Sequence, residues 1–260
     1  MPPGGAQQVL SEAHRPRSRA QAGVRPGGSG WRRWILKRHL HNWAWVAPLV
    51  LLALVRGHRH FELPSEDTDA LTDAAGGLLL AAGIFIRLCA RGWKYETPGR
   101  GMVTGGPYGY VRHPLYLGSF LMGVGLCLIL GVPWFAAVYT VCFWAAHLPV
   151  IRLEERNLSR LWPAAYAAYV ECVPALAPSL RTLKCGGRFL PRGWGAALRK
   201  EADSVCLWPL AAIAIELAED AGSPSMLSHH LTEVRALLLL ALTVALTWAF
   251  LKTRRTAVPA

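Results

Sequence analysis

Apolar residues in this chain occur in long continuous blocks, not at the amphipathic spacings of a soluble domain. The blocks that are wide enough, or nearly wide enough, to cross a bilayer are 42–55, 74–90, 115–151, 204–218 and 236–251. A membrane-spanning helix needs about 20 mainly apolar residues. The pattern therefore predicts an all-α fold, a polytopic transmembrane helical bundle.

The block 115–151 is long enough for two spans. It contains no Asp, Glu, Lys or Arg, and Gly131-Val132-Pro133 interrupts it near the middle. Gly and Pro together are strong breakers of regular structure. We therefore expect a helical hairpin whose two legs, each about 26 Å long at 1.5 Å per residue, return the chain to the same membrane face.

The distribution of basic residues decides the number of spans, because Glu216 weakens the block 204–218. With six spans and both termini cytoplasmic, 25 of the 28 Lys and Arg residues fall in the inner segments. Those segments are 1–41, 87–114, 152–203 and 252–260. This matches the positive-inside bias, whereas omitting 204–218 would place the basic C-terminal tail outside. We expect an integral, multi-pass membrane protein with about six spans, or five if 204–218 does not insert.

Four regions follow from these spans. They are a disordered basic cytoplasmic tail (1–41), a transmembrane core (42–180), a basic cytoplasmic linker (181–203), and C-terminal transmembrane helices with a short tail (204–260). Within the core, residues 153–173 carry apolar side chains at three- or four-residue spacing. That spacing predicts a cytoplasmic amphipathic helix, interrupted near Pro163.

Composition narrows the possible partners. The chain is 53% hydrophobic and 17% charged, and its net charge is +12. Basic loops that face anionic lipid account for that charge, and no basic stripe on a soluble fold suggests a nucleic acid. The six Cys residues show no metal-ligand spacing, so we expect reduced thiols and no metal site.

Two polar clusters flank the predicted hairpin, at 105–118 and 152–158. The first holds Arg112, whose planar guanidinium suits a carboxylate, and His113, a further hydrogen-bond donor. The second holds Glu154 and Glu155, which can accept from an ammonium group or from hydroxyls. The hairpin brings the two clusters together at the cytoplasmic interface.

The order of these motifs resembles the isoprenylcysteine carboxyl methyltransferase and phospholipid methyltransferase superfamily. The chain reads Gly-Pro-Tyr at 106–108, Arg-His-Pro-x-Tyr-x-Gly at 112–118 and Glu-Glu at 154–155. The chain departs from the family where Trp162-Pro163 replaces Phe-Gly, and where Ala175-Leu176 follows Val-Pro in place of an Arg and an aromatic residue. The likeness covers roughly residues 74–180.

The resemblance implies S-adenosylmethionine as the cofactor, bound at the cytoplasmic face. The implied cofactor-binding residues are Gly106, Pro107, Tyr108, Arg112, His113, Pro114, Tyr116, Gly118, Glu154 and Glu155. Arg112 and Glu154 are the expected positioning residues. No catalytic base is assigned, because the methyl donor is already activated and the protein mainly positions and desolvates the reactants.

The expected partners are the bilayer and a lipophilic methyl acceptor. Candidate substrate-binding residues are Arg91, His147, Tyr166 and Tyr169. An isoprenylcysteine carboxylate, a lipid amine and a lipid hydroxyl all remain possible acceptors. Two other functions stay open from sequence: a sterol-reductase-like enzyme using reduced nicotinamide, and a non-catalytic membrane protein with a degenerate site.

Overall fold

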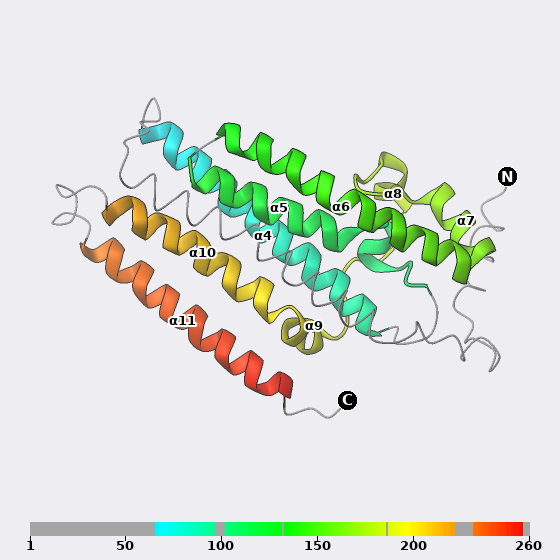
Figure 1. Ribbon diagram of the computed structural model, residues 1–260. Helices are drawn as coiled ribbons and strands as arrows, with labels where there is room; N and C mark the ends of the chain where they lie inside the picture. The colour runs from blue at the N-terminus through cyan, green and yellow to red at the C-terminus, as the bar shows by residue number, and fades with distance from the viewer. Residues whose placement is uncertain (1–65, 97–101, 132, 186, 222–230, 257–260) are drawn as a thin grey trace. The chain divides into compact units, whose positions relative to one another are not determined.

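A computed structural model describes residues 66–96, 102–131, 133–185, 187–221 and 231–256. The described residues form helices joined by short connections, and there is no strand among them (Figure 1). This agrees with the all-α prediction. The expected tail 1–41 and the first expected span 42–55 lie outside the described residues.

The first described helix, α4 (Glu66–Glu96), contains the predicted span 74–90 and extends it in both directions. A short 3-10 turn, η1 (Gly106–Gly109), precedes α5 (Pro114–Ile129). Helix α6 (Pro133–Leu161) follows. The break between α5 and α6 falls where Gly131-Val132-Pro133 predicted it, and Gly131 adopts φ 62°, a left-handed conformation that favours glycine.

Helix α6 continues past the end of the apolar block without interruption. Its polar second half and α7 (Pro163–Cys172) correspond to the predicted amphipathic segment, and the expected break occurs at Pro163. Leu158, Ala165 and Cys172 pack around a small core of buried residues. The buried members are Met102, Tyr166, Tyr169 and Val173. Leu161, at the end of α6, is 41% exposed.

Two short helices, α8 (Leu180–Cys185) and α9 (Trp194–Lys200), lie within the segment predicted as a linker. Helices α10 (Ala202–Ala221) and α11 (Leu231–Thr256) complete the described chain. They run side by side in opposite directions (Figure 1), and the Trp248 indole donates to Asp203 Oδ1 at 3.0 Å.

By internal contacts the described chain divides into two compact units. One contains residues 85–120 and 141–198, and the other contains 66–84, 121–140 and 199–256. The predicted linker thus belongs largely to the unit that also holds both polar clusters. In the other unit, α4 and α5 approach closely at Gly76 and Gly125, where a Cβ on either glycine would lie 2.6 Å from the other's carbonyl oxygen.

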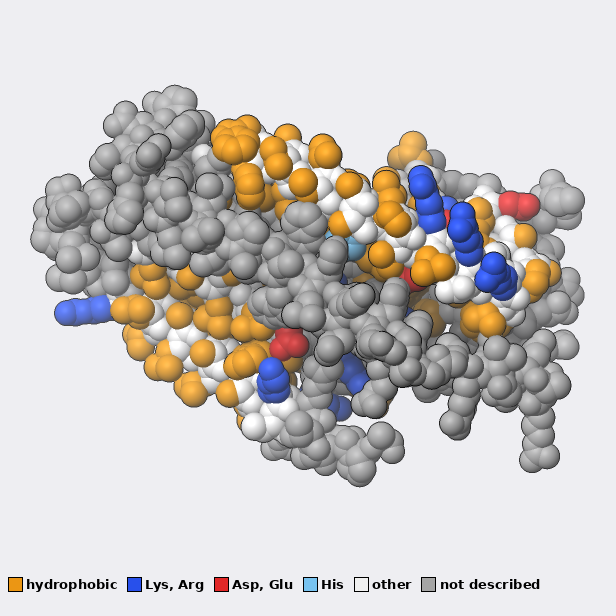
Figure 2. Space-filling view, in the orientation of Figure 1, with side chains coloured by type: hydrophobic (Ala, Val, Ile, Leu, Met, Phe, Trp, Pro, Cys, Tyr) orange, Lys and Arg blue, Asp and Glu red, His pale blue; other side chains and the backbone are white. Residues whose placement is uncertain are grey.

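Three helices of the described chain are long and apolar enough to cross a membrane. They comprise residues 70–96, 134–161 and 235–253, and the shorter α5 is also apolar. Figure 2 shows hydrophobic side chains over much of the visible surface of α11 and the first half of α6. Basic side chains gather over the second half of α6. The protein is an integral membrane protein, as its composition predicted.

Candidate active site

The start of α5 is fixed by hydrogen bonds to a segment 62 residues further along the chain. The backbone N–H of Arg112 donates to the carbonyl of Pro174 at 2.8 Å, and that of His113 donates to Ala175 at 3.1 Å. Pro114 then begins the helix, where its missing N–H costs no hydrogen bond. The Arg-His pair is therefore held by its backbone as well as by its side chains.

Glu155 of α6 is the acidic partner of this pair. Its Oε1 lies 2.8 Å from Arg112 Nη1 and 3.1 Å from His113 Nε2. The Arg112 and Glu155 side chains are 15% and 25% exposed, so the ion pair is only partly screened by solvent. The hairpin thus brings the two polar clusters into direct contact, as the sequence predicted.

Glu154 makes a different contact. Its Oε1 accepts a hydrogen bond from the Tyr116 hydroxyl at 3.1 Å. The Tyr116 ring meets His113 edge-on at 5.9 Å and His147 edge-on at 5.5 Å between ring centroids. Tyr116, at 6% exposure, therefore joins the polar cluster to the interior of the helical hairpin.

His147 is buried on α6, about two turns before the two carboxylates. Its Nδ1 lies 2.7 Å from the carbonyl oxygen of Phe143, and its ring stacks on Phe143 at 4.0 Å. Since a carbonyl can only accept, this hydrogen bond places a proton on Nδ1. The imidazole is thereby fixed in orientation beside Tyr116.

Two tyrosines of α7 complete the cluster. Tyr166 accepts a hydrogen bond from Arg112 Nη1 at 3.3 Å, and the Tyr169 hydroxyl donates to the Tyr108 carbonyl at 2.6 Å. Burial raises the pKa of both phenols, and the nearby Glu155 carboxylate raises that of Tyr166 further, against the opposing effect of Arg112. Both tyrosines consequently remain protonated near neutral pH.

Packing explains why positions 105 and 106, at the Gly-Pro-Tyr motif, are both glycine. The indole of Trp93 packs against Gly105 and Gly106 on the side where a Cβ would stand. A Cβ on Gly106 would lie 2.2 Å from Trp93 Nε1, and a Cβ on Gly105 would lie 2.6 Å from its ring. Gly106 also has φ 60°. Pro107 and Gly118, two other implied cofactor-binding residues, are buried.

Arg87 is a further polar residue near the start of α5. Its guanidinium donates to the Leu115 carbonyl at 3.1 Å and to the Ser119 hydroxyl, and the residue is only 9% exposed. From sequence alone this arginine allowed two interpretations, a positive-inside charge or a contact with a substrate headgroup. Arg91, a candidate substrate contact, lies one turn later on α4 and is half-buried.

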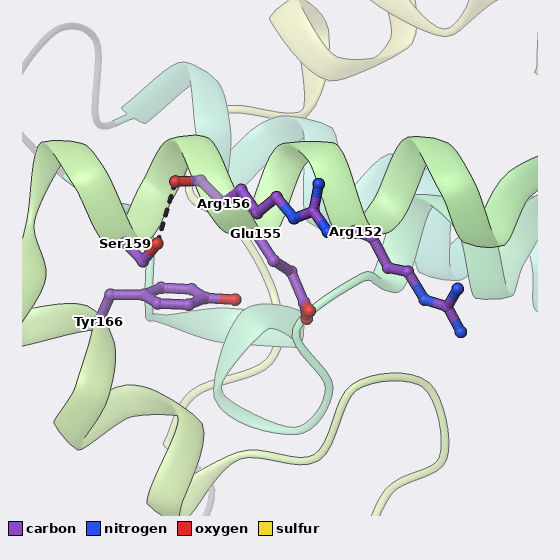
Figure 3. Close-up of a pocket in the computed structure, with 5 residues that line it drawn as sticks. All are labelled: Arg152, Glu155, Arg156, Ser159 and Tyr166. Atoms are coloured by element: carbon purple, nitrogen blue, oxygen red, sulfur yellow. Dashed lines mark hydrogen bonds between the residues drawn. The ribbon is translucent and has the colours of Figure 1, made fainter.

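A shallow hollow adjoins the Glu155 carboxylate. Its volume is about 250 Å³, and it is lined by Arg152, Glu155, Arg156, Ser159 and Tyr166. Glu155 and Tyr166 point toward one another across it from α6 and α7, while the Arg152 side chain extends away (Figure 3). Typical small-molecule sites measure about 300–1,000 Å³, so this hollow holds only part of a nucleotide-sized ligand.

The donor set is chemically suited to S-adenosylmethionine. Arg112 Nε is buried and has no hydrogen-bond partner within the described part of the chain, so an oxygen acceptor of a ligand would satisfy it. Glu154 and Glu155 provide carboxylate oxygens within the same cluster. A ligand with both a carboxylate and an ammonium group matches this combination of charges. No group of three potential metal ligands occurs among the described residues.

Comparison with known proteins agrees with the geometry. The phospholipid methyltransferase family model matches residues 70–165. Protein-S-isoprenylcysteine O-methyltransferase of Rattus norvegicus is 31% identical over 85 residues, which cover 33% of this chain and 30% of that enzyme. The chain belongs to the isoprenylcysteine and phospholipid methyltransferase superfamily. The matched residues 70–165 include both polar clusters and the hairpin between them.

Two other relatives match this chain over a longer range. The nickel-cobalt-cadmium resistance protein NccN of Alcaligenes xylosoxydans xylosoxydans is 31% identical over 191 residues, or 72% of this chain and 87% of NccN. The cobalt-zinc-cadmium resistance protein CzcN of Cupriavidus metallidurans is 31% identical over 192 residues, with 72% and 86% coverage. No solved structure matches the chain significantly.

Proposed function

We propose that this protein transfers the methyl group of S-adenosylmethionine to a lipophilic or membrane-presented acceptor. The observation that carries the proposal is the junction of Arg112 and His113 with Glu155, next to Tyr116 and Glu154, in a chain of this methyltransferase family. When bound, the cofactor supplies an activated methyl group on its sulfonium.

Each residue of the junction has a proposed task. Arg112 is held by Glu155 and Tyr166, so its buried Nε faces an acceptor such as the cofactor carboxylate. Glu154 and Glu155 offer acceptors for the ammonium group or the ribose hydroxyls. Such preorganised charges bind without reorganising at the moment of reaction. Tyr108 and His113 complete the proposed cofactor contacts, together with the loop Gly106-Pro107 and the start of α5.

The acceptor is proposed to enter from the bilayer side, past His147. This residue is 6% exposed and lies among Tyr116, Phe143 and Trp144, an aromatic surface suited to an apolar chain. Tyr166, Tyr169 and Arg91 are the other proposed substrate contacts. A carboxylate acceptor requires no general base, whereas an amine must arrive unprotonated.

We propose that the site faces the cytoplasm. We infer about six spans with both termini in the cytoplasm, because the inner segments then carry most of the basic charge. The first 19 residues of α6 extend about 28 Å, close to the hydrocarbon thickness of about 30 Å. Arg152, Arg156 and Arg160 are exposed from that point onward, at the spacing of one helical face. The junction would thus sit at the inner headgroup level.

The direct test is incubation of membranes containing the protein with labelled S-adenosylmethionine, followed by identification of the labelled lipid or protein. Arg112→Ala is expected to abolish labelling while the protein remains inserted. Arg160→Ala is the matched control, because it removes an exposed arginine of α6 and is expected to label normally. Saturable binding of reduced nicotinamide, with no binding of S-adenosylhomocysteine, would overturn the proposal in favour of a reductase.

The names of NccN and CzcN suggest a physiological setting. NccN is named for resistance to nickel, cobalt and cadmium and CzcN for resistance to cobalt, zinc and cadmium, and this chain is similar to each over most of its length. We infer that the methylated product contributes to metal tolerance in the host. The Arg112→Ala gene should then fail to restore tolerance to nickel, cobalt or cadmium in a deletion strain. Full restoration by Arg112→Ala would instead favour a non-catalytic role.

A further inference from the structure

The segment 187–193 is bound to the end of α4 by several independent contacts. Glu96 Oε1 accepts hydrogen bonds from the backbone N–H groups of Arg192 and Gly193, the latter at 2.9 Å. Pro191 is buried against Gly92, where a Cβ would lie 2.6 Å from the proline ring. These contacts fix the backbone of 187–193 against α4, so the segment is not a loosely attached linker.

The same segment contacts the loop that precedes Arg112. The Tyr110 hydroxyl donates to the Gly187 carbonyl at 2.9 Å, and the Tyr110 ring meets Phe189 edge-on at 5.5 Å. Phe189 also stacks on Phe85 at 5.9 Å between centroids. Residues 187–193 therefore connect α4 with the Gly105–Tyr110 loop.

Trp93 lies at the centre of this arrangement. Its Nε1 donates to the Phe189 carbonyl at 2.9 Å, and its indole fills the space beside Gly105 and Gly106. The Arg188 guanidinium lies 5.6 Å from the Trp93 ring centroid, within the range of a cation–π contact. Any displacement of Trp93 would move the loop backbone, because the indole is in van der Waals contact with it.

We propose that residues 187–193 form a strap that positions the Gly105–Tyr110 loop for cofactor binding, acting through Trp93. The inference rests on the proposed function, since it treats this loop as part of the cofactor site. The strap acts on the loop and not on the reacting atoms, so its members are positioning residues. It should therefore alter cofactor affinity more than the rate of methyl transfer.

Two substitutions release the strap by different means. Gly92→Ala places a methyl group where Pro191 now packs, and Glu96→Ala removes the acceptor for two backbone N–H groups. Glu96→Gln keeps an acceptor oxygen and serves as the conservative rescue. Gly77→Ala is the matched control, because the same change on the same helix meets no atom within 4 Å.

Titration of each detergent-purified protein with S-adenosylhomocysteine measures the effect on binding. Glu96→Ala is expected to raise Kd roughly tenfold, the effect of losing hydrogen bonds to a charged group at a partly exposed site. Gly92→Ala is expected to raise Kd by a similar factor, because its methyl group would displace Pro191. The kcat at saturating methyl donor should stay within about twofold. Glu96→Gln and Gly77→Ala should bind about as tightly as the parent protein.

Hydrogen exchange in the ligand-free protein tests the strap without reference to the cofactor. Amides of residues 105–111 should exchange faster in Gly92→Ala and Glu96→Ala than in Gly77→Ala. Unchanged exchange in both variants would overturn the strap. Unchanged Kd values for Gly92→Ala and Glu96→Ala would also overturn the strap. If Arg112→Ala abolished binding in the same experiment, the proposed cofactor site would still be supported. Absence of binding by the parent protein would overturn the proposed function and with it the strap's role in cofactor binding.

Discussion

The Arg112–Glu155 ion pair offers a quantitative test of the hairpin geometry. Glu155→Gln removes the charge that faces both Arg112 and His113 but preserves the shape of the side chain. A hydrogen bond to a charged group contributes roughly 1.5–3 kcal/mol. Breaking a fully buried pair costs about 3–5 kcal/mol. Because these side chains are 15% and 25% exposed, we expect a loss of about 1.5–3 kcal/mol.

A double-mutant cycle separates this pair from general destabilisation. Glu155→Gln, Arg112→Gln and the double variant are compared by denaturant unfolding in one detergent. The interaction free energy should be about 1.5–3 kcal/mol, since the double variant leaves no unpaired buried charge. Glu171→Gln, an exposed change on α7, should lie within about 0.5 kcal/mol of the parent protein.

Additive effects, within about 0.5 kcal/mol, would refute the reasoning, because they would mean that the two groups do not interact. The cycle needs no cofactor and no knowledge of the acceptor. It therefore tests the structural junction on its own, apart from the proposed chemistry.

Two further predictions concern helix packing. Gly76→Ala should lower stability by about 1–3 kcal/mol, because its methyl group would meet the α5 backbone, whereas Gly77→Ala on the same helix should be neutral or slightly stabilising. Thermal unfolding in detergent would show a lower midpoint for the first variant only. Trp248→Phe should cost about 1 kcal/mol by losing its hydrogen bond to Asp203. Trp134→Phe, at an indole that is 58% exposed, is its control, and equal midpoints for the two would contradict the α10–α11 contact.

The hairpin was predictable because its signals are local. An uncharged apolar block with one Gly-Val-Pro break predicts two helices. Because the apolar stretches on either side of the break are similar in length, the chain returns to the membrane face from which the first helix started. The sequence could not decide which glutamate pairs with Arg112. Glu154 and Glu155 are adjacent, so they differ by about 100° around the helix axis, and only the register of α6 against α5 selects Glu155.

The strap was not predictable for a different reason. Its hydrogen bonds to other described residues join positions 77 to 97 apart, and they use backbone groups of 187–193. Backbone donors and acceptors are present at every non-proline residue, so they leave no signature in the composition. The basic character of this segment indicated a linker on the membrane surface, whereas the aromatic Phe189 and the buried Pro191 anchor it to α4.

The continuity of α6 explains how a membrane protein can hold a charged site with accuracy. The helix passes from its apolar first half to Glu154 and Glu155 without a loop, so the carboxylates inherit the register of the packed hairpin. The backbone of Arg112 and His113 is fixed separately by Pro174 and Ala175, downstream of α7. The Arg-His pair and the two carboxylates are therefore positioned by different elements, the first by the segment after α7 and the second by α6. The region from 162 to 176 is consequently part of the site, although it contributes few charged groups to it.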